Sequence, residues 1–166
     1  ILGTFQSFVD PGHSLPTFIT ELTGITDEML ISAPYIDEVL PSLFDFLGSA
    51  DETVVVAHNS PFDLSFLKAA SLTHEFKWPD YVTVDTARLA RAVLDRDEIV
   101  NCKLATLAQF FGASTSPTHR ALDDALATVD VLHGLIERLA GFDVHNFEQM
   151  RSFPSRKKRT KRPISE

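Results

Sequence analysis

The sequence lacks the features that mark several protein classes. Cys102 is the only cysteine among 166 residues, which excludes an internal disulfide and fits a reducing, cytoplasmic compartment. No apolar run reaches the roughly 18 residues that a transmembrane helix needs, so we expect no membrane span. No Cys/His spacing suits zinc. No glycine-rich phosphate loop follows a strand, which argues against a nucleotide-driven machine.

Basic residues are also scarce over most of the chain. Residues 1–150 contain 8 Lys and Arg against 22 Asp and Glu, a net charge of −14, whereas residues 151–166 contain 7 against 1, a net charge of +6. An acidic body is unsuited to coating nucleic acid, because phosphate binding requires cations. It can still handle a nucleic-acid end if metal ions supply positive charge. We therefore predict one domain over residues 1–150 and a flexible basic tail or linker over residues 151–166.

Short β-branched runs alternate with helical patterns, which predicts an α/β domain. We expect strands at residues 1–9, 53–57 and 81–84. Helices are expected at residues 34–47, 87–94 and 104–111. Two further helices should begin near residues 26 and 60, and a long last helix should end at residue 139. Residues 53–57 are apolar and β-branched, as in a strand buried on both faces. Pro41 lies inside a helical pattern, so a kink or a restart is expected there.

A histidine and a carboxylate lie five residues apart at the start of the longest expected helix. Residues 114–118 are polar and rich in turn formers, which places His119 on a loop. Asp124 falls near the first helical turn, where the helix dipole favours a negative charge. A carboxylate can hold a divalent cation while an imidazole takes a proton from water. The alternative is an ordinary helix acid and a solvated histidine. The apolar stripe of the helix is expected at Ala125, Val129, Leu132, Ile136 and Leu139.

A second carboxylate lies at another strand-to-helix junction. Ser60 is suited to cap a helix that has Pro61 at its first position, with Asp63 in the first turn. Carboxylates that gather at such junctions can share Mg²⁺ or Mn²⁺ through oxygen ligands. Asp85, at the end of another strand, is interpreted as an N-cap rather than a ligand.

Two segments resemble motifs of a known family. Residues 57–67 (AHNSPFDLSFL) resemble the second motif of the DnaQ-like DEDDh 3′→5′ exonucleases, which include the exonuclease domain of the DNA polymerase III epsilon type. Residues 119–125 (HRALDDA) resemble the third motif, His-x-Ala-x-x-Asp. Residues 22–30, 84–86 and 104–108 are similar to connecting segments of that family, and the resemblance runs from Ile1 to about Leu139.

The resemblance implies a ribonuclease-H-like fold, with a mixed central sheet flanked by helices. It also implies hydrolysis at a nucleic-acid 3′ end by two ions, Mg²⁺ or Mn²⁺. Asp63 and Asp124 would be metal ligands, and His119 the general base. The implied substrate is a single-stranded DNA 3′ end, in proofreading or repair, with RNA left open. A polymerase, or a fused nuclease such as a C-terminal UvrC-like GIY-YIG module, would be a partner.

Five further positions are candidates for substrate binding, each with a structural alternative: Leu22, Thr23, His58, Asn59 and Phe66. Leu22 and Thr23 line the terminal-nucleotide site or pack in the core. His58 and Asn59 contact substrate or hold the strand-to-helix turn. Phe66 stacks on a base or belongs to the core. Asp123 lies about 100° around the helix from Asp124, so it is interpreted as a solvated acid and not as a second ligand.

The first motif of the family, Asp-x-Glu on a central strand, has no counterpart in this sequence. Because Ile1 is not methionine, and because the first residues lack the basic and apolar regions of a signal peptide, we expect the motif upstream of Ile1. Without that strand, each unpaired N–H or C=O group costs about 1–3 kcal/mol, against a total stability of about 5–15 kcal/mol. Residues 1–166 alone are therefore expected to be inactive and at risk of misassembly. The alternative from another class is a non-catalytic nucleic-acid-binding or assembly domain.

Overall fold

Two short parallel strands form the sheet of the described residues. β1 (Val54–Ala57) pairs with β2 (Val82–Asp85), in a register that places Val54 opposite Val82 and Ala57 opposite Asp85. β-Branched residues favour this pleated conformation. Because parallel strands point the same way, the helices that follow both strands begin at one edge of the sheet.

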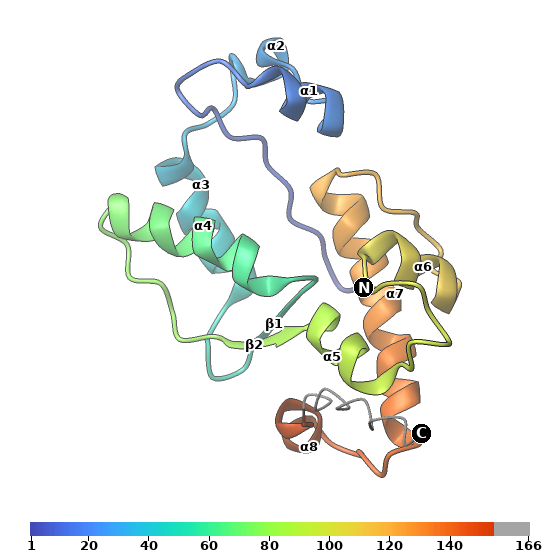
Figure 1. Ribbon diagram of the computed structural model, residues 1–166. Coiled ribbons are helices and arrows are strands. Elements are labelled where there is room, and N and C mark those ends of the chain that lie inside the picture. Colours follow the sequence, from blue (N-terminus) through green and yellow to red (C-terminus); the bar gives the residue numbers. More distant parts are fainter. Residues whose placement is uncertain (155–166) are drawn as a thin grey trace, which may run out of the picture.

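The computed structural model describes residues 1–154 (Figure 1), and the expected basic tail lies outside the described residues from position 155 onward. The helices are α1 (Thr17–Thr23), α2 (Asp27–Leu30), α3 (Ile36–Leu47), α4 (Ser60–Thr73), α5 (Thr86–Val93), α6 (Leu104–Phe111), α7 (Ala121–Ala140) and α8 (Phe147–Ser152). These elements confirm the expected α/β class. None of the helices in residues 1–154 is long and apolar enough to cross a membrane.

Local signals account for several element ends. The Asp85 carboxylate accepts hydrogen bonds from the N–H groups of Ala87 and Arg88, at 2.9 and 3.3 Å, which confirms Asp85 as the N-cap of α5. Gly112 ends α6 with a φ of 66°, a left-handed conformation that glycine adopts without strain. α3 does not restart at Pro41 and continues to Leu47.

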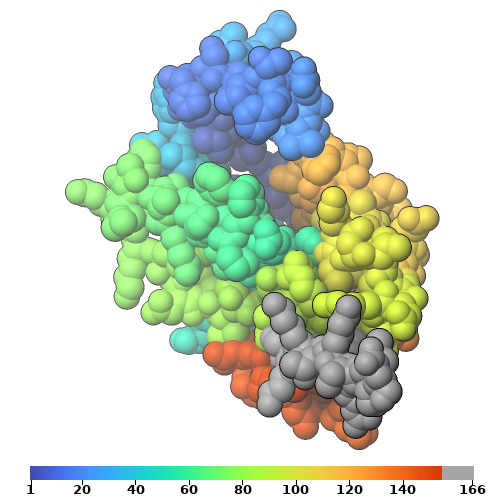
Figure 2. All heavy atoms as spheres, viewed as in Figure 1, coloured from blue at the N-terminus to red at the C-terminus, as the bar shows by residue number. Residues whose placement is uncertain are grey.

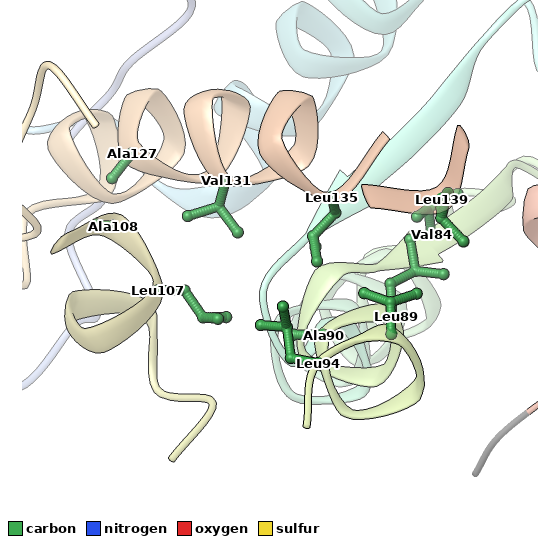
Figure 3. Close-up of a cluster of buried hydrophobic side chains, with 11 residues drawn as sticks. Val84, Leu89, Ala90, Leu94, Leu107, Ala108, Ala127, Val131, Leu135 and Leu139 are labelled. Carbon is green, nitrogen blue, oxygen red and sulfur yellow. The ribbon is translucent and has the colours of Figure 1, made fainter. Parts of the chain in front are cut away.

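The main hydrophobic core lies where α5 and α6 pack on α7 (Figure 3). Leu89, Leu107 and Leu135 come from these three helices and are fully buried in it. Gly134 lets α6 approach α7 closely, because a side chain at this position would overlap the ring of Phe111. α8 packs Phe147 and Met150 against the same core. This packing fixes the direction of α7 and therefore of its first turn.

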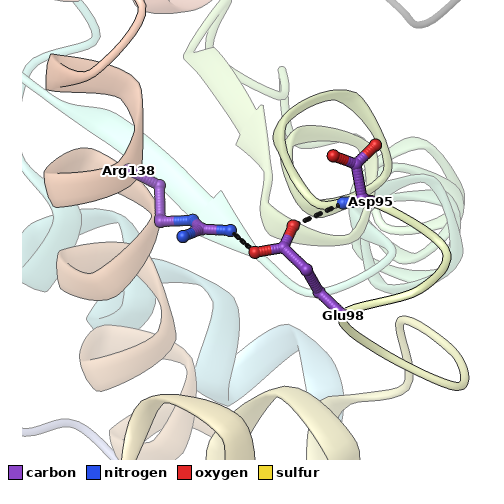
Figure 4. A network of polar contacts seen from close by, with 3 residues as sticks. All are labelled: Asp95, Glu98 and Arg138. Atoms are coloured by element: carbon purple, nitrogen blue, oxygen red, sulfur yellow. Dashed lines mark hydrogen bonds and ion pairs between the residues drawn. The ribbon is translucent and has the colours of Figure 1, made fainter.

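A polar contact fastens the far end of α7 to the loop after α5 (Figure 4). The Glu98 carboxylate pairs with the Arg138 guanidinium and also accepts the Asp95 N–H at 2.8 Å. The pair is partly exposed, so it adds little to stability by itself. It joins two segments 40 residues apart in sequence.

The strand expected at residues 1–9 is wrong. No residue of this segment belongs to a strand in the described part of the chain. The segment packs through side chains instead, with the Phe5 and Phe46 rings 5.6 Å apart, and the Asp10 N–H donates to the Pro34 carbonyl at 2.9 Å. A strand requires a neighbour for its N–H and C=O groups, and none lies beside this segment within residues 1–154.

Two local expectations around β1 also need correction. Val54 is 39% exposed and the rest of β1 is half-buried, so the strand is not buried on both faces. A sheet of two strands leaves each strand with a single paired edge. The N-cap of α4 is Asn59, in a left-handed conformation with φ of 65°, rather than Ser60, which begins the helix. Asparagine tolerates this conformation better than most residues do.

α7 buries a different face from the one expected. Its buried residues are Ala127, Thr128, Val131, Leu135 and Leu139, of which only Leu139 belongs to the predicted stripe. Ile136, from the predicted stripe, is 45% exposed. Both faces of α7 carry apolar side chains, and packing against α5 and α6 decides between them.

Candidate active site

A cavity of about 780 Å³ lies between β1, α4 and the first half of α7. Figure 2 shows the surface hollowed between α4 (green) and α7 (orange). Its polar lining includes Asp63 from α4, Asp124 from α7 and His119 from the preceding loop. Val56 and Leu104 contribute to its apolar walls. The fold therefore brings the three predicted catalytic residues to one cavity.

Burial and a neighbouring negative charge both act on the Asp63 carboxyl. Partial burial, and in second place the Asp124 carboxylate, raises the pKa of Asp63 above its usual range. Two carboxylates in this relation provide oxygen ligands of the kind that Mg²⁺ and Mn²⁺ prefer. Within residues 1–154, no group of three or more His, Cys, Asp or Glu side chains suits a metal ion. The pair fits a divalent cation as part of a ligand set.

The loop before α7 is held by the carboxylate of Asp124. Its Oδ1 atom accepts the N–H groups of Thr118 and His119, at 3.1 and 3.3 Å. His119 has a φ of 63°, in the left-handed region, and its side chain is exposed. The expected loop position of His119 is confirmed. Asp124 consequently has a structural role in addition to the predicted one.

Asp123 makes a side-chain contact that the sequence did not suggest. Its Oδ2 atom accepts a hydrogen bond from the Thr118 hydroxyl at 2.6 Å. Asp123 also does not line the cavity, in keeping with its expected orientation away from a metal site. Sequence spacing alone gave no signal for this contact, because it depends on how the loop turns.

His58 and Asn59 hold the junction between β1 and α4. The His58 Nδ1 atom lies 3.0 Å from the Thr86 Oγ1 atom. Burial lowers the pKa of His58. The Asn59 N–H donates to Asp85 at 2.9 Å. These contacts favour the structural alternative for both residues, although His58 also lines the cavity.

Leu22, Thr23 and Phe66 are not among the residues that line the cavity. The Thr23 hydroxyl donates to the Ile19 carbonyl at 2.8 Å, within α1. Leu22 is 50% exposed. Phe66 is 63% exposed, with its ring 5.1 Å from that of Phe62. The core alternative for Phe66 is therefore wrong.

Arg120 was not singled out from the sequence. Its guanidinium donates to the Thr23 carbonyl at 3.4 Å and lies 5.7 Å from the centroid of the Phe8 ring. Arg120, which directly follows His119, thus connects the start of α7 to the end of α1. Its position between His119 and the helix was the only signal in the sequence.

Comparisons with known proteins agree with this geometry. The family described as Exonuclease (RNase_T) matches residues 1–132. A Mycobacterium tuberculosis (strain CDC 1551 / Oshkosh) protein, "Putative bifunctional exonuclease/endonuclease protein", is 50% identical over 153 residues, which cover 92% of this chain and 23% of that protein. A DNA polymerase III PolC-type protein of Caldanaerobacter subterraneus subsp. tengcongensis is 37% identical over 152 residues, which cover 92% of this chain and 10% of that protein. The chain thus spans a quarter or less of the length of these relatives.

A solved structure has the same fold. Exonuclease X in complex with 5′ overhanging duplex DNA matches with a TM-score of 0.63 and 23% identity, over 87% of this chain and 77% of that chain. This match confirms the ribonuclease-H-like α/β fold. The family match spans most of the chain and includes both motif segments that contain Asp63, His119 and Asp124. The chain therefore belongs to the Exonuclease (RNase_T) family.

Proposed function

We propose that this chain is the catalytic domain of a metal-dependent 3′→5′ exonuclease that hydrolyses phosphodiester bonds at DNA 3′ ends, in proofreading or repair. The observation that carries the proposal is the meeting of Asp63, His119 and Asp124 at one cavity. Family membership supports nuclease chemistry. The PolC-type relative supports a polymerase partner, and the DNA bound to exonuclease X supports a DNA substrate.

The residues have distinct roles in this proposal. Asp63 and Asp124 hold two divalent ions, Mg²⁺ or Mn²⁺, together with further ligands. When bound, such ions supply positive charge that stabilises negative charge developing on the phosphodiester oxygens. The acidic body of the chain needs this charge, because it would otherwise repel the DNA backbone.

His119 acts as the general base in this scheme. Its exposed imidazole accepts the proton of the attacking water, a role that histidine side chains often take in catalysis. His58 cannot take this part as readily, because its ring is half-buried and already contacts the Thr86 hydroxyl. His58 and Asn59 instead position the helix start that carries Asp63.

A non-catalytic nucleic-acid-binding or assembly domain is the second candidate. The observation that favours it is the absence, within residues 1–154, of a group of three metal-binding side chains. A further alternative is an exoribonuclease of the same family, which would cleave RNA instead of DNA. Such an enzyme would have to recognise the 2′-hydroxyl group of the RNA ribose.

The experiment measures nucleotide release from single-stranded DNA and RNA carrying a label at the 3′ or the 5′ end. The protein carries its native N-terminus, and each reaction contains Mg²⁺, Mn²⁺ or EDTA. We expect early mononucleotide release from 3′-labelled DNA, dependent on metal and abolished in Asp124→Ala. The variant Glu137→Gln, an exposed acid farther along α7, serves as the matched control. Binding without release by folded protein would favour the non-catalytic domain, and faster release from RNA would favour the exoribonuclease.

A further inference from the structure

We infer that Asp123 and Thr118 form a positioning pair that holds the His119 backbone in its functional conformation. The inference rests on the proposed function of His119. The Thr118 hydroxyl donates to the Asp123 Oδ2 atom at 2.6 Å. Thr118 directly precedes His119, so this hydrogen bond fixes the residue from which the histidine backbone starts.

The His119 backbone needs such support. Its φ of 63° lies in the left-handed region, which residues other than glycine seldom occupy. Such a conformation persists only where surrounding contacts determine it. The preceding residues are rich in Ser, Thr and Pro and offer no regular hydrogen-bonding pattern of their own.

α7 supplies the contacts at both ends of this loop. The Asp130 carboxylate accepts the Ser114 N–H and hydroxyl at 2.8 and 2.7 Å. Near the other end, Asp124 accepts the Thr118 and His119 N–H groups, while Asp123 takes the Thr118 hydroxyl. The loop is therefore fastened to a helix whose own direction is fixed by the hydrophobic core.

The Asp123 contact differs from that of Asp124 in one respect. The Asp124 oxygen that holds the loop belongs to a carboxylate that is also proposed to bind a cation. The loop and the cation therefore share one carboxylate. Asp123 does not line the cavity, and its hydrogen bond to Thr118 does not depend on what the cavity holds. Asp123 can therefore hold the loop in position while Asp124 binds the cation.

The test compares variants that remove the hydrogen bond with variants that keep it. Asp123→Ala and Thr118→Val remove it, whereas Asp123→Asn and Thr118→Ser retain an acceptor or a donor. In the full-length protein we expect kcat for DNA hydrolysis to fall about tenfold in the first two variants, with KM unchanged. The conservative pair should stay within about twofold of wild type. The double variant Thr118→Val/Asp123→Ala should be no slower than either single variant.

A second measurement does not require activity. NMR exchange of the Thr118 and His119 amide protons should be faster in Asp123→Ala and Thr118→Val than in wild type and in Glu137→Gln. If wild type releases no nucleotide, the proposed function fails, and amide exchange still decides the inference. The inference is overturned if both exchange and kcat are unchanged in either removal variant. It is also overturned if Asp123→Asn loses as much activity as Asp123→Ala, since charge would then matter and not the hydrogen bond.

Discussion

Asp63 and Asp124 line one cavity from two different helices, and partial burial together with the charge of Asp124 raises the pKa of the Asp63 carboxyl. The two residues lie 61 positions apart in sequence, so only the packed fold brings them together. An ionised carboxyl with a raised pKa opposes folding at neutral pH. The predictions on Asp63 and on metal ions follow from this relationship.

Replacement of Asp63 should stabilise the metal-free protein. Asp63→Asn removes the ionised group, so we expect a higher Tm than wild type at pH 7 in EDTA. A carboxyl whose folded pKa is raised gains stability as pH falls from the folded pKa towards the ordinary value of 3.8. The difference between variant and wild type should therefore shrink over that pH window. An unchanged Tm difference across the window would contradict this account.

Divalent ions should reverse this order of Tm values, so that wild type becomes more stable than Asp63→Asn. A ligand that binds only the folded state stabilises by RT ln(1 + [L]/Kd), about 2.7 kcal/mol at 100 times Kd. We expect Mg²⁺ or Mn²⁺ to raise the Tm of wild type, and to have little effect on Asp63→Asn or Asp124→Asn. Glu137→Gln should respond as wild type does. An equal response in all four proteins would place the ions elsewhere.

Acid should weaken the junction held by His58. Burial lowers the pKa of His58 below 6.5, so the folded state favours the neutral ring. The stability that this gives is present above pH 6.5 and is lost as pH falls towards the folded pKa. Urea unfolding between pH 7.5 and 5 should lose stability more steeply in wild type than in His58→Gln. NMR titration of the ring checks the pKa directly.

Gly134 should not tolerate a methyl group. Alanine is normally about 1 kcal/mol better than glycine inside a helix, but here its Cβ would overlap the Phe111 ring. Overpacking of this kind typically costs about 1–3 kcal/mol, so Gly134→Ala should lower the unfolding free energy. The loss should be smaller when Phe111→Leu is also present. Chemical denaturation of the four proteins in the cycle measures the coupling.

The sequence predicted the features that depend on neighbouring residues. Asp85 was identified as an N-cap, and His119 as a loop residue, from turn formers and helix-start signals close to them. The motif residues Asp63 and Asp124 were also found correctly at strand-to-helix or loop-to-helix junctions. Family motifs were needed to connect the two, because no local pattern shows that α4 and α7 share a cavity.

Features that depend on tertiary packing could not be predicted. Residues 1–9 have strand-like composition, but a strand forms only beside a partner. α7 has apolar side chains on two faces, and contact with α5 and α6 selects one. α8 is short, and its place comes from Phe147 and Met150 reaching the core. The hydrogen bond between Thr118 and Asp123 requires the left-handed backbone at His119. No rule of residue spacing predicts that conformation.

The Asp85 carboxylate joins two junctions at once, since it caps α5 and also accepts the Asn59 N–H at the start of α4. Fraying of the first turn of α5 would release this carboxylate, and the turn that leads to Asp63 would lose its anchor. The starts of the two helices should therefore open together, as one cooperative unit. A residue outside the cavity lining thus determines how long the cavity keeps its shape.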